Sequence, residues 1–268
     1  MTAQHVGEVR MQQRMSAVTV PVITVLAVAV SIVTAFVGSG AVGGTPISQA
    51  AGGAFSSDGT PLSPAGPAFS IWSVIYLGLI GYAVWQLFPA PRRSERHRAL
   101  RPWAIASALL NAAWIWSVQL GLVAGSVVVI VALLLVLIRM LLLLHASHAS
   151  GWADALVTDG TLGLYLGWVS VATVANISAW ISGWVTEPFA GWELLAVAIL
   201  IVAGGIGVAL ALRTHGRLAP ALSMAWGLAW IGAGRASGQF ESAMLTWTAG
   251  VAACVVLLVA VIARRRRR

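Results

Sequence analysis

Apolar runs of about 20 residues, separated by short segments that hold most of the charged residues, dominate this sequence of 268 residues. A helix needs about 20 such residues, rising 1.5 Å each, to cross the roughly 30 Å hydrocarbon core of a bilayer. Only 9% of the residues are charged, which excludes an ordinary soluble domain. The pattern predicts an all-α, polytopic membrane bundle of about eight transmembrane helices. We place them at residues 18–37, 69–88, 103–120, 123–144, 162–184, 194–212, 218–233 and 243–263.

The positions of the arginines support this number of spans. All 16 basic residues are arginines, and basic residues stay on the cytoplasmic side of a multi-span protein. With the N-terminus inside, eight spans leave only Arg235 outside. We therefore expect a protein of the cell (plasma) membrane with both termini cytoplasmic. The arginines on the cytoplasmic side are then Arg10, Arg14, Arg92, Arg93, Arg96, Arg98, Arg101, Arg139, Arg213, Arg217 and residues 264–268.

The charge and the cysteine content exclude several classes of protein. The net charge is +8, but the arginines lie beside apolar runs, where topology and lipid headgroups explain them better than nucleic acid does. The absence of lysine excludes Schiff-base chemistry. Cys254 is the only cysteine, so an internal disulfide, an iron–sulfur cluster and a cysteine-based zinc site are excluded. We expect membrane lipids as partners, no nucleic acid, no metal and no required cofactor.

Two segments without helical character organise the chain. Residues 38–68 are rich in Gly, Ser and Pro, and a loop of this length is either disordered or a lid. Residues 185–191, with Pro188, separate a bundle at residues 1–185 from a three-helix membrane extension at residues 186–268, which ends in an arginine tail.

The first apolar run leaves a second interpretation open. Arg10 and Arg14 before it and the small residues 38–44 after it also fit a cleaved signal peptide. The run of about 20 apolar residues exceeds the roughly 7 to 15 of such peptides, so we favour a retained span.

Polar and aromatic side chains inside the apolar runs point to a function. Asn111 and Asn176 lie within runs, where a polar side chain usually faces other helices or a cavity. Rings at several depths on one helix face suit a flat, apolar ligand whose polar edge an amide orients. The alternative is that the asparagines join helices while the rings form interfacial belts. Two spans carry such a face. The face of the fifth span contains Tyr165, Trp168, Ala172, Asn176 and Trp180, and that of the second span contains Phe69, Trp72, Tyr76 and Ile80.

Other polar residues give weaker signals. His145 and His148 are spaced to share a metal, but no carboxylate lies in register, so we interpret them as solvated at the interface. Asp154 and Asp159 precede the fifth span, where acidic residues favour a helix N-terminus.

These motifs resemble those of the tryptophan-rich sensory protein family (TspO/MBR), the bacterial relatives of the mitochondrial translocator protein. WVSVATVAN at residues 168–176, with Trp180 after it, is similar to the last helix of that family. Asn111 and Trp114 resemble its N-x-x-W motif, and residues 69–76 resemble its Phe, Trp and Tyr pattern.

The resemblance covers residues 18–184 and implies a five-helix bundle whose pocket opens under the first loop. Members of the family bind porphyrins such as protoporphyrin IX and heme, and some bind sterols and benzodiazepine-type ligands. The resemblance implies no catalytic residue. By motif position, the implied ligand-binding residues are Phe69, Trp72, Tyr76, Asn111, Trp114, Tyr165, Trp168, Ala172 and Asn176.

The sequence departs from the family in three places. Its first loop contains no Trp and no Pro-Pro pair, which speaks against porphyrin chemistry at a lid Trp. The segment after the fifth helix lacks the Tyr and the basic residue of a steroid-contact motif, so we expect no specific cholesterol binding. The three helices after Leu194 have no counterpart in the five-helix family, and we expect Trp226 and Trp230 to pack against a neighbouring helix rather than extend the pocket.

The favoured function is a membrane receptor or carrier that binds a porphyrin-like or other flat hydrophobic ligand, with porphyrin or heme as ligand rather than cofactor. The alternatives are facilitated transport of that ligand, porphyrin degradation by an enzyme, and a structural membrane protein without a ligand. Ionisable residues are nearly absent from the spans, which disfavours a proton-coupled pump. A homodimer is left open.

Overall fold

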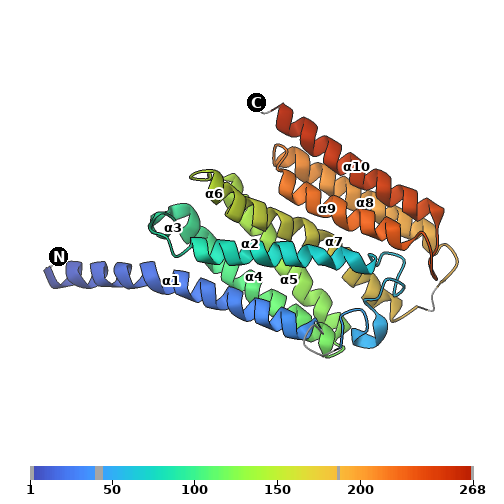
Figure 1. The fold of residues 1–268 in the computed structure, drawn as a ribbon, viewed down its shortest axis with the longest axis horizontal. Coiled ribbons are helices and arrows are strands. Elements are labelled where there is room, and N and C mark those ends of the chain that lie inside the picture. Colours follow the sequence, from blue (N-terminus) through green and yellow to red (C-terminus); the bar gives the residue numbers. More distant parts are fainter. Residues whose placement is uncertain (1–2, 40–44, 186–187, 267–268) are drawn as a thin grey trace.

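The computed structural model describes residues 3–39, 45–185 and 188–266, and this part of the chain contains helices and no strand. The long helices run nearly parallel or antiparallel to one another (Figure 1). They are α1 (Ala3–Gly38), α2 (Ile71–Trp85), α4 (Glu95–Gln119), α5 (Val123–His145), α7 (Thr161–Ser182), α8 (Trp192–Arg213), α9 (Leu218–Gly234) and α10 (Ala243–Arg265). Short elements connect them: η1 (Ala50–Gly53), η2 (Gly66–Ser70), α3 (Pro89–Arg93), α6 (Trp152–Asp154) and the π-helical turn η3 (Ala155–Gly160).

The prediction of a polytopic helical membrane bundle is confirmed. Within the described residues, six segments are long and apolar enough to cross a membrane: residues 19–38 of α1, and segments that contain α2, α5, α7, α8 and α10. The remaining two long helices correspond to predicted spans as well, but α4 carries charges in its first two turns and α9 has 17 residues. The tight turn between α4 and α5 passes through Gly121, whose φ of 71° favours glycine.

Several helix boundaries differ from the predicted spans. α1 begins at Ala3 and α4 at Glu95, well before the apolar runs at residues 18 and 103. A helix does not end where its apolar stretch ends, because Arg, Gln and Glu have high helix propensity in water. The small residues that a signal peptidase would need lie partly in 40–44, outside the described residues.

The helices pack into two hydrophobic clusters. The first lies among α1, α2, α4, α5 and α7. The second lies among α8, α9 and α10, and it also contains Val171 of α7 and Leu62 of the loop before α2. α7 and α9 join the two clusters at close range: a Cβ added at Gly167 would lie 2.9 Å from Cβ of Ser223, and one at Gly227 would lie 2.9 Å from Cγ1 of Val171. Small residues thus bring these two helices together, as in other membrane bundles.

We name the two ends of the bundle by what they carry. The arginine end comprises residues 86–101, 145–160 and 213–217 and the last turn of α10. The loop end comprises residues 45–68, 119–123, 183–185, 188–191 and 235–242. The N-terminus and the C-terminus point toward the arginine end, where α3 and α6 also lie (Figure 1).

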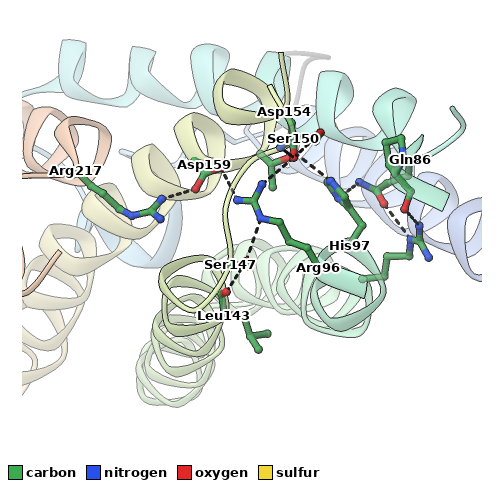
Figure 2. A network of polar contacts seen from close by, with 12 residues as sticks. Gln86, Arg96, His97, Leu143, Ser147, Ser150, Asp154, Asp159 and Arg217 are labelled. Carbon is green, nitrogen blue, oxygen red and sulfur yellow. Dashed lines mark hydrogen bonds and ion pairs between the residues drawn. The ribbon is translucent and has the colours of Figure 1, made fainter. Parts of the chain in front are cut away.

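A continuous polar network occupies the arginine end (Figure 2). Arg96 of α4 is its centre: Nη1 pairs with Oδ2 of Asp154 at 2.8 Å, Nη2 pairs with Oδ2 of Asp159, and Nε donates to Ser147 at 3.2 Å. Arg217, which caps α9, pairs with the other oxygen of Asp159 and donates to the carbonyl oxygen of Leu144 at 2.8 Å. The network therefore ties α4, the π-helical turn η3 and α9 together.

The same network continues toward α2 and α3. His97 Nε2 lies 3.1 Å from Oδ1 of Asp154, and its Nδ1 lies 2.9 Å from Nε2 of Gln86. Arg101 donates to Gln86 at 3.0 Å and to the carbonyl oxygen of Pro91 at 2.7 Å.

Two interpretations of charged residues from the sequence change as a result. Asp154 lies in the first turn of α6 and its Oδ2 accepts from the backbone N–H of Ser150 at 3.0 Å, but it is buried and paired with Arg96. Arg96 and Arg101 are buried polar partners in this network, so topology and lipid headgroups alone do not account for them. The sequence could not show this for Arg96, because its partners are 51 to 63 residues away along the chain.

Candidate ligand-binding site

Aromatic side chains from α2 and α7 meet beneath the loop end of the first cluster. The Trp72 ring stacks on Tyr76 with centroids 5.1 Å apart and meets Trp168 edge to face at 6.4 Å. Phe69, in the turn before α2, lies 5.7 Å from Trp168. The rings that share a face in each helix therefore face the bundle interior at these positions.

The loop before α2 covers these rings. Ala51, Gly52 and Gly53 all have positive φ, and they turn the chain back so that Phe55 lies over α4. The Phe55 ring meets Trp114 edge to face at 6.3 Å. Of the two interpretations of this loop, disordered segment or lid, residues 45–68 thus adopt the covering arrangement.

The two asparagines have different surroundings. Asn111 Nδ2 donates to Ser31 of α1 at 3.1 Å and to the Tyr76 hydroxyl at 3.2 Å, while its Oδ1 is buried without a partner. Asn176 Oδ1 accepts from Ser126 of α5 at 2.8 Å. Both amides thus join helices, and Asn111 keeps an acceptor atom free.

Two hollows adjoin these side chains. A central cavity of about 30 Å³ lies between α4, α5 and α7, and Asn111, Trp168 and Asn176 are among its lining residues. A groove of about 610 Å³ lies between α1, α2 and α4 under the loop. Five side chains line both hollows and separate them: Phe55, Pro64, Phe69, Trp72 and Trp114.

The structure places the nine residues of the sequence hypothesis as follows. Asn111, Trp168, Ala172 and Asn176 line the central cavity, Tyr76 lines the groove, and Phe69, Trp72 and Trp114 line both. Tyr165 lines neither: it is buried, packs edge to face on Trp72 at 5.7 Å and donates to the carbonyl oxygen of Ser107 at 3.4 Å.

Two residues at the ends of the helix faces lie away from these hollows. Ile80 is 45% exposed on the outer surface of α2. Trp180 lines a separate cleft of about 870 Å³ at the loop end, formed by residues 51–59, the α4–α5 turn and the end of α7.

The lining of the two hollows is largely apolar and aromatic. Among the described residues that line the two hollows, Tyr76 is the only ionisable group, and none is a carboxylate, imidazole, thiol or guanidinium. Two indole N–H groups, of Trp114 and Trp168, are buried without a hydrogen-bond acceptor. Buried polar atoms without partners are costly, and of these groups only the Trp114 indole also lines the groove.

The loop residues of the site escaped prediction. Phe55 and Pro64 come from the loop, and a loop ring gives no periodic signal that separates it from its neighbours. Trp226 and Trp230 of α9, as expected, pack rather than line either hollow: Trp226 Nε1 donates to the carbonyl oxygen of Ala68 at 2.9 Å, and Trp230 packs against the first cluster. His145 stacks on His215 with centroids 5.5 Å apart, and the described residues contain no group of three or more metal-ligating side chains.

The comparisons with known proteins give one match. A family model described as TSPO-like protein matches residues 22–262, a range that includes α8, α9 and most of α10. No curated protein and no solved structure matches the chain.

Proposed function

Because this chain belongs to the TSPO-like protein family, we propose that it is a multi-pass membrane receptor or carrier that binds a flat hydrophobic ligand of the porphyrin class. The observation that supports this most is the 610 Å³ groove, in which the rings of Phe69, Trp72, Tyr76 and Trp114 gather beneath the loop. We further propose the plasma membrane as its location, with the arginine end facing the cytoplasm.

The sizes of the two hollows support the proposal that the guest lies in the groove. Sites for small molecules usually measure about 300 to 1,000 Å³, so the groove is large enough and the central cavity of about 30 Å³ is not. The ring of the guest would lie against Trp72 and Trp114, with polar substituents directed toward the hydroxyl of Tyr76. Asn176 and Ala172 lie deeper, behind these rings, and would contact only a guest that displaces them.

The same lining disfavours acid–base catalysis and proton-coupled transport. Both need groups that gain and lose protons near neutral pH, and the lining residues offer none beyond the phenol of Tyr76. Sensing and passive carriage need no such group. We therefore favour binding without turnover of the ligand.

The test compares two tryptophans of α4. Trp114 is 7% exposed and lines the groove, whereas Trp116, two residues on, is 46% exposed on the outer face. Titration of the purified protein with protoporphyrin IX should quench tryptophan fluorescence. Trp114→Leu should weaken the affinity about tenfold, because an aromatic contact contributes about 0.5 to 1.5 kcal/mol beyond area burial.

The matched control is Trp116→Leu, which should leave the affinity as in the parent. Asn176→Leu should cost less affinity than Trp114→Leu if the guest lies in the groove. Equal affinities in both tryptophan variants, or no saturable quenching at all, would refute the proposed site.

A further inference from the structure

Arg235 is the one arginine that departs from the topological pattern, and it lies at the loop end, where α9 meets α10. Its side chain is fully buried, at 0% exposure. Nη1 donates to the carbonyl oxygen of Thr60 at 3.0 Å, and Nη2 donates to that of Ser57. Its guanidinium carbon lies 5.7 Å from the centroid of the Phe240 ring. Within the described residues, no carboxylate forms an ion pair with it.

The last part of α9 also contacts this loop, residues 45–68. The backbone N–H of Ala65 donates to the carbonyl oxygen of Trp230 at 3.0 Å. Trp226 holds the carbonyl oxygen of Ala68 through its indole N–H. Gly234 lies so close that an added Cβ would be 3.3 Å from the backbone nitrogen of Ala65. The loop therefore takes four hydrogen bonds from or to α9 and Arg235.

The loop also divides its apolar side chains between the two clusters. Phe55 belongs to the first cluster and covers the groove, whereas Leu62 belongs to the second, among α8, α9 and α10. Ser63 and Pro64, next along the chain, line the central cavity. Any movement of the loop away from the rings must therefore pull Leu62 out of the C-terminal cluster and break the bonds to Arg235.

We propose that the end of α9 (residues 226–235) is a latch that holds the loop closed over the ligand site, with Arg235 as its main positioning residue. The three C-terminal helices then control how often the site opens. Burying a guanidinium costs free energy unless its donors are satisfied, and loop carbonyls satisfy two of them only while the loop is closed. The opening of the lid does not depend on the identity of the guest, but the effect on binding rates rests on the proposed function.

The test measures loop opening without any ligand. In a Cys254→Ala background, Ser63→Cys places a single thiol at a position that is 3% exposed. A polar maleimide should label Cys at position 63 slowly. Arg235→Met should raise the labelling rate about tenfold or more, because losing one hydrogen bond to a charged group shifts an equilibrium by at least that factor. Association and dissociation of protoporphyrin IX, followed by stopped-flow quenching, should both become faster.

Two further variants make the result decisive. Arg139→Met removes an exposed arginine that lies over Trp103, far from the loop, and should change neither labelling nor rates. Trp226→Phe keeps an aromatic ring but removes the N–H that donates to the carbonyl oxygen of Ala68, and it should raise the labelling rate by a smaller factor. This variant tests the latch if Arg235→Met does not fold. Labelling as slow as in the parent, in whichever of these latch variants folds, would overturn the latch. Faster labelling without porphyrin quenching in any variant would support the latch and refute the proposed function.

Discussion

Gly167→Leu is expected to separate the three C-terminal helices from the rest of the bundle. Gly167 of α7 faces α9, where an added Cβ would lie 2.9 Å from Cβ of Ser223 and 3.0 Å from the carbonyl carbon of Pro220. These neighbours are a helix backbone and a short side chain, so neither can move aside without moving α9. Overpacking of a tight core costs about 1 to 3 kcal/mol and occasionally more, and we expect about 3 kcal/mol or more here.

The measurement is the free energy of unfolding in mixed micelles with increasing denaturing detergent, followed by tryptophan fluorescence. Gly205→Leu is the matched control, because Gly205 lies on α8 with no atom within 4 Å of its added Cβ. It should be neutral or slightly stabilising, since glycine is a poor helix former. If the two leucine variants unfold at the same detergent fraction, α7 and α9 do not pack as closely as described.

The helices and the inward aromatic faces could be predicted from the sequence because both depend on local spacing. Apolar runs of membrane length give the helices, and residues three or four apart give the face on which Trp168 and Asn176 lie. The same spacing cannot say where a face ends. Ile80 and Trp180 continue the two faces by angle, yet Ile80 is exposed on α2, where its neighbour Leu79 and later Tyr82 are the buried residues, and Trp180 lies at a different cleft.

The sequence offered a lid as one of two interpretations of the loop, but the contacts that hold the loop in place could not be predicted, because they join distant segments of irregular backbone. Arg235 lies 178 residues from Ser57. The sequence marks it only as an exception to the distribution of arginines. That exception has a physical reason: the guanidinium is held inside the protein by loop carbonyls, so it does not follow the rule that governs solvated charges. An arginine on the unexpected side of a membrane protein is thus a candidate for a structural contact.

Asp154→Asn is expected to destabilise the arginine end strongly. The carboxylate is 1% exposed and pairs with both Arg96 and His97. It also accepts from the Thr158 hydroxyl at 2.8 Å. Removing one partner of a buried ion pair costs about 3 to 5 kcal/mol, because the other charge stays buried without compensation. Arg96 keeps its pair with Asp159, so we expect a loss near the lower end, at about 3 kcal/mol.

Glu95→Gln is the matched control for this change, since it also neutralises one acid that is paired with an arginine of α4. Glu95 pairs with Arg98 at 3.2 Å, but the two side chains are 90% and 66% exposed, and such pairs contribute about 0 to 1 kcal/mol. The unfolding free energies of both variants, measured as for Gly167→Leu, should therefore differ by about 2 kcal/mol or more. Equal values would mean that water reaches Asp154 and that the network does not tie α4 to η3. A loss in Asp154→Asn alone would show that the buried network contributes more to stability than an exposed ion pair of the same helix end.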